Sequence, residues 1–438
     1  MYICIHIMRS HNPINFLRSR FILPLALLNI FIFIIFFYTF FSTNPQQLIK
    51  HGHRDIIDVQ KPHGKLLILM WTRIFGEQSM QLHSDCPLAS YCEITYDKTF
   101  LPEASAIVFH IPDIKWITQL KTKNLAYDLP EVPDLPIRSV VKRKVNVFMS
   151  HENPSTLKTY YASRSLAKHV NNYFHWVMTY LHTSHISFPY GGFWVSPEET
   201  VKHGFTPVKI PFDANSILNN KTVRGILWLV SNCDSNSKRK VAVEALQKYI
   251  NVTIGGKCGK TSADRSICPR NKDCSYLYSN YYFHIAIEND ICRDYITEKF
   301  WDRYKLPSIP IVLRASIYQG VVPNNSYIAI DQFKSPREMA DYLTWLMDNP
   351  SEYLKYFEWR SKGWSIAPWN HEGFRIGLVF ILILNITHSL SQCALCEQLL
   401  RLSNGSLPFP DTIPNAVDWF ENNSHCEGGD FALHWSQQ

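Results

Sequence analysis

The chain has 438 residues, of which 18% are charged and 46% hydrophobic, and its formal net charge is +7. This length is enough for two domains with sizeable cores, and the composition is that of a folded rather than a disordered chain. The modest positive charge suits an anionic ligand, but it is too small to indicate a nucleic-acid-binding protein.

The N-terminal region contains an unbroken apolar run, Phe21–Phe41, that carries no charge. It is long enough to cross a bilayer as a helix, and the arginines before it predict that residues 1–20 are cytosolic. A cleaved signal peptide is the alternative, although no convincing small-residue cleavage site follows the run. We therefore predict a single transmembrane signal anchor at 21–41, followed by a polar, proline-containing stem at 42–63.

Two features of the remaining chain suit a location in the secretory lumen. Ten cysteines follow the anchor, and an even number is what a disulfide-bonded protein allows. The Asn-x-Ser/Thr sequence required for N-glycosylation begins at six candidate residues: Asn220, Asn251, Asn324, Asn385, Asn404 and Asn422.

Apolar runs separated by longer, helix-sized segments predict two α/β domains. The first domain, 64–212, contains strand-like runs at Lys65–Trp71, Ala106–Ile111 and Val145–Met149. The second domain, 213–362, contains such runs at Arg224–Val230, Val252–Ile254, Tyr282–Ile287 and Tyr327–Ile330. Within it, Ser335, Pro336 and Glu338 form the start signal of a helix.

The segment 281–314 has the pattern strand, turn, helix, strand. Polar residues at 288–290 interrupt the apolar run, and Asp294 is a candidate N-cap for the helix that follows. In open α/β sheets such carboxyl ends of strands bind nucleotides. Glu298 and Lys299 in the first turns could then reach a sugar and a diphosphate, although an isolated pair of this kind is more often an ordinary surface pair.

The longer motif ENDICRDYITEKFW resembles the donor-site motif of the α1,3/α1,4-fucosyltransferases, glycosyltransferase family 10, usually written YxFxLAFENSxxxDYITEKxW. The resemblance extends over most of the chain after the stem. SHENPS at 150–155 is similar to the family's ESP element, FHWVMTY at 174–180 to FNWTMSY, SNCDSNSKRKV at 231–241 to SNCxxxSxRxxxV, and CALCEQL at 393–399 to CxLCxxL.

The resemblance implies a GT-B architecture, in which two Rossmann-like domains face a cleft, with the acceptor on the side of the first domain. It also implies an inverting α1,3-fucosyltransferase that moves L-fucose from GDP-β-L-fucose to an N-acetylglucosamine hydroxyl of a glycoprotein or glycolipid glycan. The expected location is the Golgi membrane, in single-pass type II orientation with a lumenal catalytic domain. No cofactor or metal site is expected, a divalent ion being at most stimulatory, because nothing in the sequence resembles an Asp-x-Asp site.

Site residues follow from the same resemblance. Glu152 is expected to be the general base, and Lys299 to neutralise the diphosphate leaving group. The expected donor-binding residues are Ser231, Asn232, His284, Glu288, Asn289, Tyr295, Thr297, Glu298 and Lys299.

The pair Cys393 and Cys396 could by itself be a zinc half-site, a redox pair or two halves of separate disulfides. In the family the equivalent cysteines bond to an N-terminal pair, here Cys86 and Cys92. That would fasten a C-terminal tail, 363–438, onto the first domain.

Three departures from the family pattern stand out. The residues at 181–185, Leu-His-Thr-Ser-His, lie where the family has Arg-x-Asp-Ser-Asp, whose arginine contacts the donor diphosphate, and His284 replaces a usual tyrosine. The apolar run Ile376–Leu384 is a buried helix or strand, or a translated intron. A catalytically impaired relative, which binds GDP-fucose or glycan or assists an active paralogue, is therefore the alternative function. The acceptor glycan and the oligomeric state are not readable from the sequence.

Overall fold

The computed structural model describes residues 64–82, 86, 88–118, 131–141, 143–160, 163–191, 193–202, 213–269, 272–367 and 389–438. They all belong to one compact unit, residues 61–438. Within these ranges, no helix combines the length and the apolar character needed to cross a membrane. The predicted anchor and stem, the run Ile376–Leu384 and the sequon at Asn385 lie outside the described residues.

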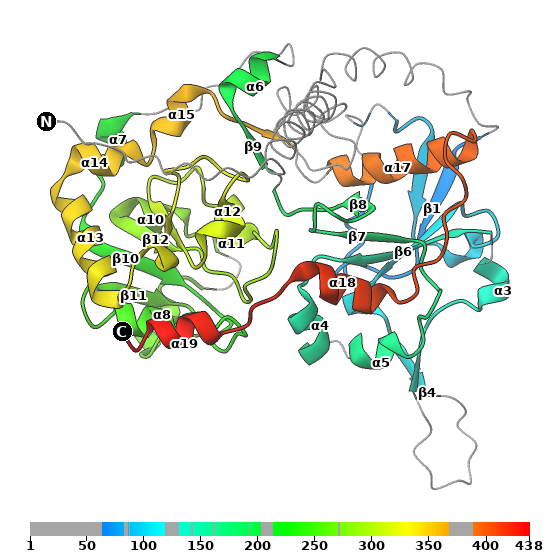
Figure 1. Ribbon diagram of the computed structural model, residues 1–438, viewed down its shortest axis with the longest axis horizontal. Helices are drawn as coiled ribbons and strands as arrows, with labels where there is room; N and C mark the ends of the chain where they lie inside the picture. The colour runs from blue at the N-terminus through cyan, green and yellow to red at the C-terminus, as the bar shows by residue number, and fades with distance from the viewer. Residues whose placement is uncertain are drawn as a thin grey trace, which may run out of the picture. The chain divides into compact units, whose positions relative to one another are not determined.

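The first sheet is formed by six parallel strands in the order β2-β1-β3-β6-β7-β8. Their bounds are β1 Leu66–Met70, β2 Cys92–Thr95, β3 Ala106–His110, β6 Val145–Ser150, β7 Trp176–Thr179 and β8 Ile186–Ser187. Every residue of β3 and β6 is buried, because helices cover both faces of the sheet (Figure 1). The apolar runs at 106–111 and 145–149 therefore predicted these two strands correctly.

The second sheet has five parallel strands in the order β11-β10-β12-β13-β14. Their bounds are β10 Val223–Leu229, β11 Val252–Gly255, β12 Tyr281–Ile285, β13 Ile309–Val312 and β14 Ile328–Ala329. In each sheet the strand that comes first in the chain, β1 or β10, lies between the next two strands of the chain. The direction in which the chain adds strands to the sheet therefore reverses beside β1 and beside β10. Ligands of doubly wound sheets bind at this switch point, outside the carboxyl ends of the strands.

The helices around the second sheet include α8 Arg239–Leu246, α11 Glu298–Trp301 and α13 Pro336–Asp348. Ser335 caps α13 as predicted, since its hydroxyl accepts from the Glu338 backbone N–H. The N-cap of α11, in contrast, is Thr297 and not Asp294, which has a positive φ of 59°. Both residue types are good caps, and tertiary contacts described below decide between them.

The C-terminal segment reaches both sheets. α17 (Ser389–Ser403) packs on β1 and β8, and α18 (Ala416–Ser424) packs on α4 (Pro154–Tyr160) and α5 (Ser163–Ala167), whereas α19 (Asp430–Trp435) packs on α8 (Figure 1). Disulfides join Cys86 to Cys393 and Cys92 to Cys396. The tail is thus fastened to the first domain, as the resemblance implies, but its last helix belongs to the second, which corrects the predicted packing.

The other described elements connect these parts. They are η1 Lys98–Phe100, η2 Ile111–Asp113, β4 Trp116–Thr118, β5 Glu131–Pro133, α3 Arg138–Val141, β9 Phe193–Val195, α6 Pro197–Lys202, α7 Ala214–Leu218, α9 Ser262–Ser266, α10 Ser275–Asn280, α12 Ala315–Tyr318, η3 Ile330–Gln332, α14 Pro350–Lys355, α15 Glu358–Lys362 and β15 Ser365–Ala367. β9 and β15 pair antiparallel, so the segments that leave the two large sheets meet there.

Candidate active site

The carboxyl ends of β6 and β12 bring together the predicted base and the predicted donor motif. Glu152 follows β6, and the Tyr295 hydroxyl, in the loop after β12, donates to its Oε2 over 3.3 Å. Gly191 of the first domain lies against the Trp301 ring, where an added Cβ would come within 2.0 Å of a ring atom. Only glycine fits at this close approach, which keeps α11 beside the Glu152 loop.

Glu288 organises the start of α11. Its carboxylate accepts from the Thr297 backbone N–H over 2.7 Å and from the Thr297 hydroxyl over 2.9 and 2.8 Å. Lys299 Nζ lies 3.0 Å from Glu288 Oε2 and 3.0 Å from Glu298 Oε1. These contacts explain why Thr297 and not Asp294 caps the helix: the buried Glu288 fixes it there.

The charges of this cluster are coupled. Burial raises the pKa of Glu152, while the Lys299 charge and the Tyr295 hydrogen bond counteract part of that rise. Burial likewise raises the pKa of Glu288 against the effect of Lys299. Burial lowers the pKa of Lys299, but the two neighbouring carboxylates outweigh it and hold the pKa above its usual value. A carboxyl with a raised pKa beside a permanently charged lysine is suited to general-base chemistry next to an anion.

The switch point of the second sheet adds polar groups. Ser231 and Asn232 are exposed just beyond β10, and the Asn289 side-chain Oδ1 is buried without a hydrogen-bond partner among the described residues. Arg239, at the start of α8, donates to the Ile287 carbonyl over 2.7 Å and to the Asn232 carbonyl over 3.0 Å. We gave Arg239 no role from the sequence, although it is the arginine of the SNCxxxSxR element.

His284 does not join this cluster. It is fully buried in β12, where its ring meets Tyr278 edge to face, with 5.1 Å between the ring centroids. Burial lowers its pKa well below the usual value, with Arg303 and Lys221 as the charged groups that add to the shift. The side chain lies in the core, so donor contact by His284 stays a prediction.

Leu181 is also buried. It has 0% exposure within the hydrophobic cluster of the first domain, which includes Tyr180, Cys292 and Tyr295. Its side chain therefore packs in the apolar core and does not face an open phosphate site. The adjacent His182 makes the polar contacts instead: its backbone N–H donates to Asp294 Oδ2 over 3.1 Å.

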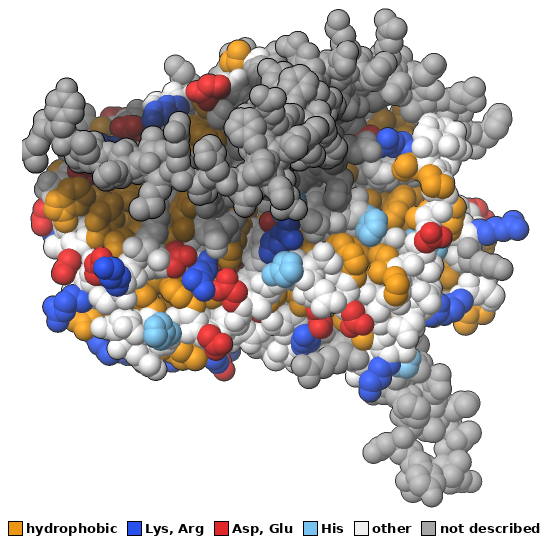
Figure 2. Space-filling view, viewed as in Figure 1, with side chains coloured by type: hydrophobic (Ala, Val, Ile, Leu, Met, Phe, Trp, Pro, Cys, Tyr) orange, Lys and Arg blue, Asp and Glu red, His pale blue; other side chains and the backbone are white. Residues whose placement is uncertain are grey.

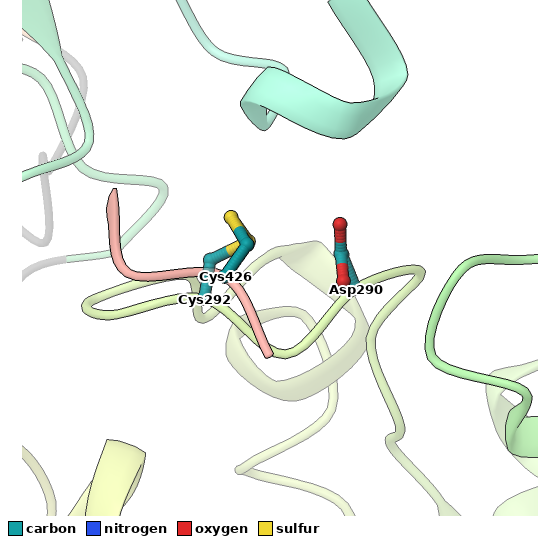
Figure 3. A group of neighbouring side chains, drawn as sticks. All are labelled: Asp290, Cys292 and Cys426. Carbon is teal, nitrogen blue, oxygen red and sulfur yellow. A yellow bond between two sulfur atoms is a disulfide. The ribbon is translucent and has the colours of Figure 1, made fainter. Parts of the chain in front are cut away.

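A group of possible metal ligands includes two cysteines that form a disulfide in this structure. Asp290, Cys292 and Cys426 lie together, and the two cysteines are bonded to each other (Figure 3). Their sulfurs are therefore not available as thiolates. With Cys233–Cys258 and Cys268–Cys274, all ten cysteines after the predicted anchor are in disulfides.

The described residues line two further cavities. One, of about 540 Å³, is lined by His182, Asp294 and residues after β13, but by neither Glu152 nor Lys299. The other, of about 470 Å³, lies at the switch point of the first sheet and is lined by Trp71, Arg73 and Asp113 among others. On the face shown in Figure 2, acidic and basic side chains are mixed rather than gathered into a single-sign patch.

The fold and the cluster define an α/β protein with two parallel sheets and an acid–base site where loops from both meet. The family model described as "Glycosyltransferase family 10 (fucosyltransferase) C-term" matches residues 218–410, and the model "Fucosyltransferase, N-terminal" matches residues 63–191. The chain belongs to glycosyltransferase family 10, which confirms the resemblance.

Individual relatives agree with this assignment. Alpha-(1,3)-fucosyltransferase fut-1 of Caenorhabditis elegans is 32% identical over 300 residues, which are 68% of this chain and 59% of that relative's length. The human 4-galactosyl-N-acetylglucosaminide 3-alpha-L-fucosyltransferase FUT5 is 31% identical over 70% of this chain and 74% of its own. A crystal structure of alpha1,3-fucosyltransferase with GDP-fucose is 15% identical and has a TM-score of 0.43, covering 74% of this chain and 92% of that one.

Proposed function

We propose that this protein is an inverting α1,3-fucosyltransferase that moves L-fucose from GDP-β-L-fucose to an N-acetylglucosamine hydroxyl of a glycan. The observation that carries the proposal is the contact of Glu152 with the donor-motif residue Tyr295, beside the Lys299 cluster. The named activities of the relatives support it, as do two sheets that fit a GT-B architecture.

In the proposed reaction Glu152 takes the proton of the attacking hydroxyl, and Lys299 stabilises the charge that develops on the GDP diphosphate. Ser231, Asn232 and Asn289 offer polar groups at the switch point where the nucleotide is expected. An incoming diphosphate competes with Glu288 and Glu298 for Lys299, so donor binding rearranges the ion pairs. We propose that this chemistry requires no metal cofactor, the lysine and the nearby Arg239 supplying the positive charge.

We place the acceptor glycan on the first domain. The cavity of about 470 Å³ lies beyond β1 and β3, while Glu152 follows β6, the next strand of the same sheet after β3. Strands in a sheet are about 5 Å apart, so the cavity and the base are separated by roughly one or two strand spacings. Trp71→Ala should raise the acceptor KM while the GDP-fucose KM stays unchanged, and equal acceptor KM values would exclude this placement.

We further propose a Golgi membrane protein with a lumenal catalytic domain. The five disulfides suit an oxidising lumen, and the described sequon residues Asn220, Asn251, Asn324, Asn404 and Asn422 are exposed, as glycosylation requires. Glycosidase sensitivity and protease protection of the expressed full chain in microsomes test this placement.

The second candidate is a family member without turnover, which binds GDP-fucose or glycan, or assists an active paralogue. The observation in its favour is Leu181, where the family has a diphosphate-binding arginine. GDP release from GDP-fucose by the purified protein, measured with a panel of N-acetylglucosamine-containing acceptors, separates the two. Acceptor-dependent GDP release that is lost in Glu152→Gln supports the enzyme, and GDP binding without release on any acceptor supports the second candidate.

A further inference from the structure

Asp294 and Tyr295 form a tight turn in the loop after β12. Asp294 has a φ of 59°, in the left-handed region that L-residues rarely adopt. The Tyr295 backbone N–H donates to the Cys292 carbonyl over 3.2 Å, and the Ile296 N–H donates to the Asp294 carbonyl over 3.0 Å. The turn directs the Tyr295 hydroxyl to Glu152. The left-handed backbone of Asp294 therefore helps to position the hydrogen bond that Tyr295 donates to the candidate base.

His182, from the loop after β7 in the first domain, holds this turn from outside. Its backbone N–H donates to Asp294 Oδ2 over 3.1 Å, and its ring Nδ1 is in ion-pair contact with the same oxygen. Ring Nε2 lies 3.3 Å from an Arg293 guanidinium nitrogen. Nδ1 therefore faces an acceptor, the Asp294 carboxylate, and Nε2 faces a donor, the Arg293 guanidinium.

The pair is partly shielded from solvent, with side-chain exposures of 31% for His182 and 15% for Asp294. Further charged or titratable groups line the same cavity: Arg293, His425 and Glu427. The residues just before Asp294 are held by other contacts, because Cys292 is bonded to Cys426 and the Arg293 N–H donates to the Ser424 carbonyl over 2.8 Å. His182 therefore holds Asp294, while the neighbouring Tyr295 contacts Glu152, so both residues of the turn are joined to the first domain.

We propose that His182 is a positioning residue that, through Asp294, fixes the turn carrying Tyr295 against the catalytic base Glu152. The proposal rests on the proposed transferase function. It assigns a use to the residue at the variable position of the Arg-x-Asp-Ser-Asp element, with the histidine side chain acting on the loop rather than on the donor phosphates.

Amide side chains separate the two ring contacts. The Nδ2 of asparagine occupies the place of histidine Nδ1, so His182→Asn keeps a donor to Asp294 and loses the reach to Arg293. His182→Gln places its amide where Nε2 lies, so it keeps that reach and loses the donor to Asp294. His182→Ala loses both, and His169→Ala, an exposed histidine elsewhere in the first domain, is the matched control.

Loss of the side-chain contact with the Asp294 carboxylate predicts that kcat falls about tenfold in His182→Ala and His182→Gln, while His182→Asn and His169→Ala stay near the wild-type value. The Tyr295 hydrogen bond also lowers the pKa of Glu152. The acid limb of the kcat/KM profile should therefore move to higher pH in the first two variants only. Equal losses in the asparagine and glutamine variants, with an unmoved acid limb, would overturn the proposal.

Amide hydrogen exchange of the full-length protein tests the same inference without turnover. Peptides spanning 288–297 should exchange faster in His182→Ala and His182→Gln than in the wild type or His182→Asn. If no acceptor is fucosylated by the wild type, the proposed function fails, yet this result still supports His182 as the residue that holds the turn. Unchanged exchange in His182→Ala would refute the positioning role even in an active enzyme.

Discussion

Replacing Glu152 with glutamine tests the centre of the mechanism. Glutamine has the same size, and its Oε1 still accepts the hydrogen bond that Tyr295 donates over 3.3 Å, so the packing of the loop is preserved. What it lacks is the ability to take a proton from the attacking hydroxyl. General-base catalysis contributes roughly two to four decades of rate, equivalent to about 3 to 5 kcal/mol of transition-state stabilisation.

The expected result is a fall in kcat of that size with nearly unchanged affinity for GDP. Glu152 is not among the groups in contact with Lys299, which is held by Glu288 and Glu298 over 3.0 Å each. Acceptor-dependent GDP release and calorimetric titration with GDP measure the two quantities. Glu103→Gln, at an exposed carboxyl of the first domain, is the control.

The pH dependence supplies a second test of the same residue. A base must be deprotonated to act, and burial raises the pKa of Glu152, so activity should increase with pH through a value above that of a free glutamate. Tyr295→Phe removes a hydrogen bond that lowers this pKa and should move the acid limb to still higher pH. A Glu152→Gln protein with near-normal turnover, or with an acid limb identical to that of the wild type, would refute the assignment of the base.

Three further changes test the surrounding structure. Lys299→Met should weaken GDP binding by about one to two decades and lower the melting temperature, because Glu288 is left buried without its cation. Adding Glu288→Gln should restore the melting temperature but not the affinity for GDP. Leu181→Arg should lower the melting temperature without tightening GDP binding, since a guanidinium in an apolar cluster costs several kcal/mol, and tighter GDP binding would contradict the burial of this site. In chemical unfolding, Cys393→Ser should lower the free energy of unfolding by about 3 kcal/mol, because the bridge that remains still closes a very long loop. Combining it with Cys396→Ser removes both bridges and should lower that free energy by about 8 kcal/mol, whereas additive losses would argue against this connectivity.

The amino-acid sequence predicts the strands that lie deepest in the fold. β3 and β6 are buried on both faces, so their apolar runs need no alternation and end where polar residues begin. The same pattern does not tell which face of a strand a given side chain occupies. His284 lies in the core with its ring against Tyr278, which the apolar run alone does not predict.

The capping preferences of single residues likewise do not predict where α11 starts. Asp294 and Thr297 are both capping residue types, and both precede the apolar residues of the helix. The buried Glu288 selects Thr297 through three hydrogen bonds, while His182 engages Asp294 from another domain. Glu288 is 9 positions from Thr297, and His182 is 112 positions from Asp294. A prediction from the residues next to the helix start therefore cannot tell which of the two residues is the N-cap.

The replacement at Leu181 bears on whether the chain is an active transferase. A missing arginine would remove one cation from the donor site, but Leu181 lies in the apolar cluster with Tyr295, and Lys299 and Arg239 still lie at the carboxyl ends of the second sheet. The change is accompanied by His182, which engages Asp294 and so leaves that carboxylate paired. A decaying site would be expected to leave buried charges without partners, because each such charge costs stability. Here the base keeps its tyrosine, the lysine keeps its carboxylates and the loop keeps its disulfide, which favours turnover over a non-catalytic relative.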